Sequence, residues 1–155
     1  MHKTPEITRL IHDNFWVVLA FAFGQPAIAR VIDAKFRGEW KYLNKTVHER
    51  AEIRADRALL EMATQLRVLD DEQKFSDCFK QVKSAPLGEV VQADGTRTDM
   101  DFRDMMNKVM HGSAYEWKLG NDEPTIVIHS DQSDRWKTAE LRIRNLMMYI
   151  GGLMH

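Results

Sequence analysis

The alternation of apolar and polar residues predicts helices over the first half of the chain. Thr4-Pro5-Glu6 is typical of a helix start, because threonine can cap a helix and proline suits its first position. We expect this helix to run to about Phe23 and to end at Gly24. Pro26 then permits a second helix over 27–42, in which apolar residues recur at helical spacing: Ile28, Val31, Ile32, Phe36 and Trp40.

A third, charged helix is predicted over 46–68, with Asn44 as its cap. Its charged side predicts a solvated face, and an interaction face for another helix is the alternative. Asp70-Asp71 should cap a short helix over 72–83. The segment 89–98 shows only a turn signal at Asp94-Gly95.

The next helix is predicted over 100–111, with Thr98 or Asp99 as its cap and Gly112 as its end. After Gly112 the period changes to that of strands. The segments 114–119 and 124–129 are predicted strands separated by a turn. The segment 136–143 is either a third strand, which we favour, or the start of a helix that runs to 153. In the strand interpretation, Asn145 caps a final helix over 146–153.

The pattern therefore predicts a mainly α fold. We expect a bundle of four to six helices with a two- or three-stranded antiparallel β element near the C-terminus. The length of 155 residues indicates one domain over 1–155. Apolar residues make up 44% and charged residues 29%, which is typical of a globular protein. The net charge of -1 gives no general attraction to nucleic acid or to a membrane, so a nucleic-acid partner requires a local basic patch.

The single cysteine, Cys78, excludes an intramolecular disulfide and a zinc site of paired cysteines. It favours a reducing compartment, and we expect a cytoplasmic protein. Cys78 stands between aromatic residues and is interpreted as a small buried hydrophobe. The apolar run 15–23 is too short to span a bilayer, which needs about 20 residues, and is interpreted as a core helix. No membrane partner is expected.

The helix over 100–111 carries the main chemical signal. At 100° per residue, Asn107 lies about 40° and His111 about 80° from Arg103. The apolar residues Phe102, Met105, Met106 and Val109 gather on the opposite side. Any amphipathic helix shows such a polar stripe, and a histidine near a helix C-terminus is well placed without catalysis.

The residue types of the stripe suggest one chemistry. Arginine is a permanent cation suited to a phosphate, and histidine can give or take a proton near neutral pH. Arg103 and His111 are separated by about 12 Å along the helix axis. Together they could support phosphodiester cleavage without a metal or cofactor, with Asn107 orienting one of them.

The run FRDMMNKVMHG, in a helical chain with strands close behind, resembles the HEPN superfamily. Its members are small helical bundles. Many are metal-independent ribonucleases, often toxins or antiviral effectors, and others only bind. The family signature is an arginine, a polar residue, and a histidine after four to six further residues. Arg103 and Asp104 match the first two positions and His111 the last, but seven residues lie between Arg103 and His111, so the spacing departs from the family signature.

The resemblance implies a catalytic set of Arg103 and His111, supported by Asn107 and Asp104. It also implies a homodimer in which two motif helices face each other across a cleft, with RNA as substrate and a protein partner such as an antitoxin. The methionines Met105, Met106 and Met110 could line that interface, and ordinary core packing explains them equally well.

Other candidate residues favour structural roles. His48 and Glu52 share one helix face, but no second pair of metal ligands accompanies them. We therefore expect a solvent-exposed helix surface with ion pairs. His129 should be a half-exposed strand residue. Trp117 and Trp136 are expected to pair across strands, and stacking on bases is the alternative. The sequence leaves two further functions open, a non-catalytic protein-interaction or regulatory module and a nucleic-acid binder without chemistry.

Overall fold

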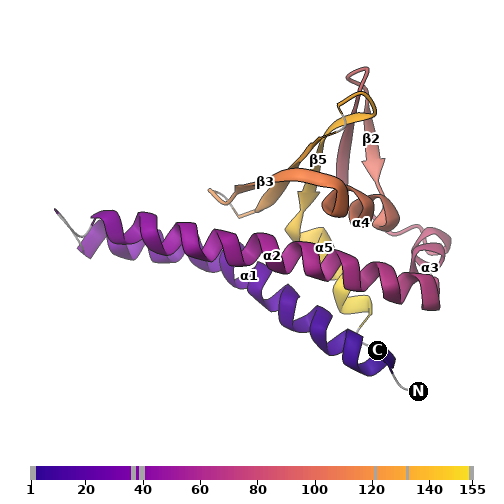
Figure 1. The fold of residues 1–155 in the computed structure, drawn as a ribbon, viewed down its shortest axis with the longest axis horizontal. Helices are drawn as coiled ribbons and strands as arrows, with labels where there is room; N and C mark the ends of the chain where they lie inside the picture. Colours follow the sequence, from indigo (N-terminus) through magenta and orange to yellow (C-terminus); the bar gives the residue numbers. More distant parts are fainter. Residues whose placement is uncertain (1–2, 36–37, 39–40, 121, 132, 154–155) are drawn as a thin grey trace.

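A long antiparallel helical hairpin forms one side of the molecule. The computed structural model describes residues 3–35, 38, 41–120, 122–131 and 133–153. Helices α1 (Lys3–Lys35) and α2 (Lys41–Gln73) lie side by side, and one end of the hairpin extends well beyond the sheet (Figure 1). Their facing sides supply much of the core, including Ile11, Val18, Leu59 and Met62.

The two helices predicted over 4–23 and 27–42 are wrong as separate elements. Helix α1 continues through Gly24 and Pro26 to Lys35. Proline inside a helix removes one backbone hydrogen bond and costs about 3 kcal/mol. Burial of Ala22 and Ile32 on either side of Pro26 offsets that cost by tertiary packing. The predicted apolar positions Phe36 and Trp40 lie outside the described residues, and Tyr42 and Asn44 belong to α2.

The predicted capping role of Asp70 is performed from the preceding helix. Asp70 and Asp71 lie in the last turn of α2, and Lys74, with a left-handed φ of 59°, connects α2 to α3 (Phe75–Gln81). The Asp70 carboxylate accepts hydrogen bonds from Ser76 N (2.7 Å) and Ser76 Oγ (2.8 Å). It thereby satisfies a free N–H in the first turn of α3. The predicted range 72–83 was therefore too long.

The sheet is larger than predicted and begins before the motif helix. It contains β1 (Gly88–Gln92), β2 (Arg97–Met100), β3 (Gly112–Lys118), β4 (Thr125–Ser130) and β5 (Trp136–Arg142), all antiparallel, in the order β2-β1-β5-β4-β3. The β1–β2 hairpin turns at Asp94-Gly95, where Gly95 has φ 88°. The strand interpretation of 136–143 is confirmed, whereas two strands of segment 88–100 were missed.

Helix α4 (Phe102–His111) lies between the sheet and α2 (Figure 1). Its N-terminus is closed by a capping box in which Asp101, and not Thr98 or Asp99, is the cap. Met105, Met106 and Val109 are fully buried, so core packing is the correct explanation of the first two methionines. Helix α5 (Ile143–Gly152) starts earlier than predicted, and Asn145 lies inside it.

Two side-chain predictions are corrected by the packing. Cys78 is exposed, because α3 turns Ser76 and Phe79 toward the protein instead. Trp117 and Trp136 do not pair, because β4 lies between their strands. Trp117 instead packs edge-on against Phe21 with ring centres 5.0 Å apart.

The observed fold is a mainly helical chain with an antiparallel sheet, and strands lie on both sides of α4 in the sequence.

Candidate functional site

The polar side of α4 opens at its C-terminal end onto a groove of about 310 Å³. Helix α4 contributes Asn107, Lys108 and His111 to this groove, and the sheet contributes the rest of its lining: Gln92, Arg135 and Trp136. We call these six residues the α4 groove. Histidine, lysine and arginine side chains from separate parts of the sequence therefore meet at one place.

Strand register brings the sheet residues to the groove. Gln92, the last residue of β1, pairs with Trp136, the first residue of β5. The backbone carbonyl of Arg135 accepts a hydrogen bond from Ala93 N at 3.3 Å, which holds the turn before β5 against the end of β1. Gln92 Nε2 donates to Thr98 Oγ1 at 2.9 Å, so the Gln92 amide is fixed by the neighbouring strand.

The described lining of the groove carries cations and no carboxylate. Lys108 Nζ lies 4.7 Å from the centre of the Trp136 ring, a cation–π contact that orients the ammonium group. Trp136 is buried and contributes an apolar surface to the groove. Arg135 and His111 are exposed at the rim. A site with a lysine, an arginine and a histidine side chain is suited to an anionic ligand such as a phosphate.

Asn107 links the groove to helix α2. Its Oδ1 accepts a hydrogen bond from Arg67 Nη1 at 2.6 Å. Because the guanidinium can only donate, the side-chain oxygen must face Arg67, and the Asn107 NH₂ is the group that can donate to a ligand. This hydrogen bond of Asn107 therefore goes to Arg67 of α2, and not to Arg103 or His111, one of which Asn107 was predicted to orient.

Arg103, at the other end of α4, does not line the groove. Its Nη1 lies 3.0 Å from Asp70 Oδ2 and 3.7 Å from Asp71 Oδ1. Asp71 also contacts Arg67, with 3.5 Å between Asp71 Oδ1 and Arg67 Nε. The two arginines and two aspartates form an ion-pair network that fastens α4 to the end of α2. Arg103 and His111 share a helix but lie in different surroundings.

Asp104 is part of the capping box of α4. Its backbone N–H donates to Asp101 Oδ1 at 2.8 Å, and its own carboxylate accepts from Asp101 N at 3.2 Å. Burial raises the pKa of Asp104 above its ordinary value, and the neighbouring charge of Asp101 adds to this effect. The side chain thus stabilises the start of the helix.

A second hollow, of about 300 Å³, lies where α2 meets the start of β3. Burial raises the pKa of Asp56, which accepts a hydrogen bond from Trp117 Nε1 at 2.7 Å. Burial, with the charge of Asp56, raises the pKa of Tyr115 to about 12. Tyr115 Oη donates to the Val109 carbonyl at 2.6 Å. These groups therefore attach β3 to α2 and α4.

Replacement of Asp56 with asparagine is expected to raise Tm at neutral pH. The pKa of Asp56 is raised in the folded state, so the ionised carboxylate costs stability above that pKa, whereas asparagine still accepts from Trp117. The stability gain should disappear as the pH falls below the ordinary range of aspartate, where the carboxyl is protonated in folded and unfolded chains alike. Thermal unfolding of both proteins across a pH series measures this, and a gain that persists at low pH would contradict it.

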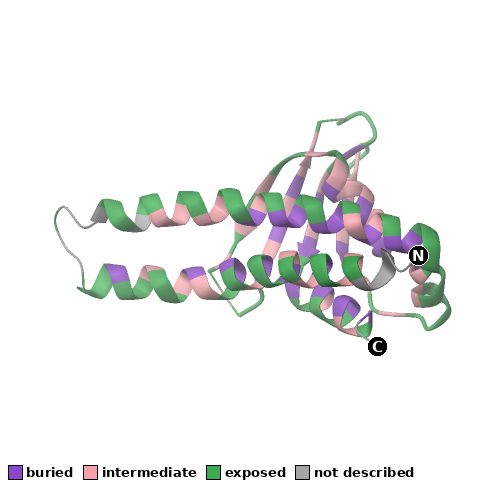
Figure 2. Cartoon of the chain, turned by 60° about the horizontal axis from the view of Figure 1, so that its bottom comes forward, coloured by how far each residue is buried: buried purple, intermediate pink, exposed green. Residues whose placement is uncertain are grey.

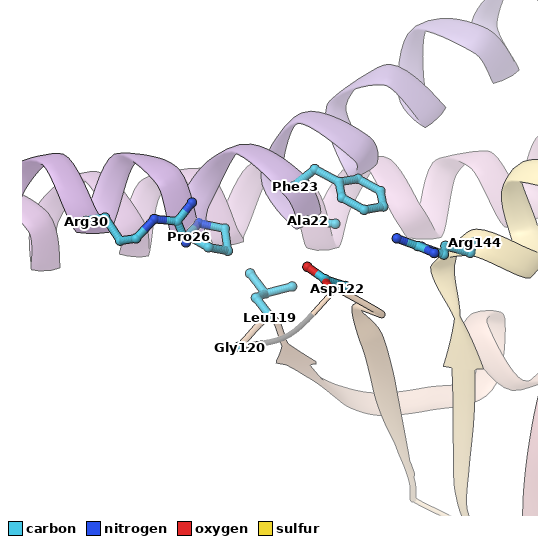
Figure 3. Close-up of a pocket in the computed structure, with 8 residues that line it drawn as sticks. All are labelled: Ala22, Phe23, Pro26, Arg30, Leu119, Gly120, Asp122 and Arg144. Atoms are coloured by element: carbon cyan, nitrogen blue, oxygen red, sulfur yellow. The ribbon is translucent and has the colours of Figure 1, made fainter.

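A third cavity, of about 210 Å³, lies between α1, the β3–β4 turn and the start of α5 (Figure 3). Arg30, Arg144 and Asp122 line it together with apolar side chains. Its described lining carries charges of both signs and no histidine. The α4 groove has the more specific chemistry.

The structure describes no cluster that matches a metal site. Within the described ranges, no group of three or more histidine, cysteine, aspartate or glutamate side chains is arranged to hold a metal ion. His48 Nε2 and Glu52 Oε2 are 3.5 Å apart on the surface of α2, as expected for a solvent-exposed helix face with ion pairs. His129, half-exposed as predicted, lies 3.2 Å from Glu116 on strand β3.

Sequence reasoning found two of the groove's side chains, Asn107 and His111, and missed the others. Lys108 was within the motif, but the helical wheel places it off the Arg103 stripe. Arg135 and Trp136 were read only as the end of a turn and the start of a strand. Comparisons of the chain with family models, with curated proteins and with solved structures found no match.

Proposed function

We propose that the protein binds the phosphate backbone of RNA in the α4 groove and cleaves it without a metal ion. The observation that supports this function is the convergence of His111, Lys108 and Arg135 in a groove whose described lining has no carboxylate. The resemblance of the α4 sequence to HEPN ribonucleases supports RNA as the substrate. It also supports a cytoplasmic protein with a toxin or defence function.

In the proposed mechanism, Lys108 and Arg135 hold the scissile phosphate and offset the charge that develops on it. His111 takes the proton from the ribose 2′-hydroxyl, and the 2′-oxygen attacks phosphorus. The bond from phosphorus to the 5′-oxygen breaks, and this oxygen takes a proton from solvent. The products are a 2′,3′-cyclic phosphate and a 5′-hydroxyl end, so DNA, which lacks the nucleophile, should not be cut.

Arg103 and Asp104 act in this proposal as positioning residues rather than catalytic ones. The carboxylates of Asp70 and Asp71 already occupy the Arg103 guanidinium. A phosphate would have to displace them at an energetic cost. We therefore assign the phosphate-holding role, which the motif suggested for Arg103, to Arg135 and Lys108.

RNA binding across a salt series tests the proposed groove. Affinity for a fluorescent single-stranded RNA should fall steeply between about 50 and about 200 mM salt. Lys108→Ala and Arg135→Ala should each weaken binding and reduce the slope of log K against log salt by about 1. Lys118→Ala, an exposed lysine at the far end of β3, is the matched control and should change neither quantity. Equal effects of all three substitutions would place the RNA elsewhere.

A non-catalytic interaction module is the second candidate. The exposed apolar side chains of α1, led by Trp16, favour it, because a tryptophan on a monomer surface commonly marks an interface. A chain that neither binds nor cleaves RNA would select this alternative.

A further inference from the structure

Helix α1 has an uncharged, exposed side around Trp16, and further along this side Phe23 and Arg30 also line the cavity beside the β3–β4 turn. From Asn14 to Ala29 the sequence has no aspartate, glutamate, lysine or arginine. Trp16, in this stretch, is 70% exposed, and Phe23 and Val31 are exposed on the same side of the helix. Figure 2 shows exposed residues along α1.

By length and composition this helix could cross a membrane. In the fold, 33% of its most apolar window is buried. Its other side packs into the core through Ile11, Phe15, Val18 and Ala22. Release of α1 into a bilayer would expose that core. A partner that covers only the outer side of α1 is therefore more compatible with the fold.

The exposed side has the spacing of a coiled-coil seam. Eight residues alternate at intervals of four and three, and all of them are exposed: Arg9, Asp13, Trp16, Ala20, Phe23, Ala27, Arg30 and Ala34. Such spacing keeps one line of side chains facing a second helix. Large and small residues alternate along the uncharged part of this line, which we call the α1 seam.

We propose that the α1 seam binds the same seam of a second copy of this chain, with the two helices antiparallel. Alignment about the midpoint between Phe21 and Ala22 places Trp16 opposite the partner's Ala27, and Phe23 opposite the partner's Ala20. Each large side chain thus meets a small one, as close packing requires. The same alignment places Asp13 opposite the partner's Arg30 at both ends of the apolar stretch.

Parallel pairing of the same seams is disfavoured by charge and volume. It would oppose Asp13 to the partner's Asp13, Arg30 to the partner's Arg30, and one Trp16 to the other. Like charges in facing positions are destabilising, so the seam selects one orientation. The interface also differs from the one that the HEPN resemblance implies, since Met105 and Met106 are inside the core.

Sedimentation equilibrium of the full chain and of a Trp16→Glu variant tests the dimer. The unmodified chain should be a dimer, and Trp16→Glu should raise the dimer Kd by about 30-fold or more. The far-UV spectrum and Tm should stay close to those of the parent, because Trp16 makes little contact with the core. Ile53→Glu is the matched control: Ile53 is 68% exposed on α2, outside the seam, and its replacement should leave the Kd unchanged.

Charge reversal tests the register and orientation. Asp13→Arg and Arg30→Asp should each weaken the dimer about 3- to 10-fold, and the double variant should regain most of the affinity, because it restores the opposite charges.

A monomeric parent chain would overturn the proposal, as would a dimer insensitive to Trp16→Glu or a double variant no tighter than the single ones. A monomer that sediments with phosphatidylcholine–phosphatidylglycerol vesicles through Trp16 would assign the seam to a membrane instead. Groove variants such as Lys108→Ala should leave the dimer intact, so this test is independent of the RNA proposal.

Discussion

His111→Ala is expected to reduce RNA cleavage by about 100-fold or more, because it removes the group proposed to take the proton from the 2′-hydroxyl. RNA affinity should fall much less, since Lys108 and Arg135 still hold the backbone. The side chain is exposed at the end of α4, so Tm should change little. Cleavage is measured on labelled RNA with excess EDTA present, and the products are examined for a 2′,3′-cyclic phosphate.

His129→Ala provides the matched control for this experiment. His129 is a second partly exposed histidine, but it lies on β4 beside Glu116 and outside the groove. Its removal should leave cleavage unchanged. Equal losses in the two variants, or full activity of His111→Ala, would contradict the assignment of His111. Complete absence of cleavage in the parent chain, with RNA binding retained, would reduce the function to nucleic-acid binding.

Asp70→Ala is expected to lower the free energy of unfolding by about 3 kcal/mol, the largest single effect on stability that we predict. The Asp70 side chain is 2% exposed and accepts hydrogen bonds from Ser76 N, Ser76 Oγ and Arg103 Nη1. Alanine would leave two buried Ser76 donors without their acceptor and would free α3 and α4 from the end of α2. Urea unfolding measures the change.

Asp71→Ala is the control for Asp70→Ala, since the two carboxylates are adjacent and contact the same guanidinium. The Asp71 side chain is 57% exposed and lies 3.7 Å from Arg103, so its ion pairs are screened by water. Its loss should cost less than about 1 kcal/mol. Similar costs for the two substitutions would show that burial of Asp70 does not decide its contribution.

The same network separates two roles for Arg103. If Arg103 is a positioning residue, Arg103→Ala should lower stability, and combining it with Asp70→Ala should cost less than the sum of the two. Cleavage per folded molecule should fall only modestly. A loss of cleavage as large as that of His111→Ala, without loss of stability, would return Arg103 to the catalytic role that the motif suggested.

The sequence by itself determined the local features of this protein. The 3.6-residue period fixed the two sides of α4, and with them the burial of Met105 and Val109 and the exposure of His111. The β-branched run of β4 and the turn at Asp94-Gly95 were also readable, because they depend on neighbouring residues alone. The helical stop at Gly24 was equally local, and there the local signal was wrong, because packing against α2 outweighed it.

Tertiary structure decided what faces each of these sides. Asp70 neutralises Arg103 across 33 positions of sequence, and Arg135 reaches the groove only because β5 pairs with β1. A helical period states which side chains share a face but carries no information on what lies opposite. That depends on contacts between distant segments, whose free energy comes from burying apolar surface and pairing charges in the assembled fold.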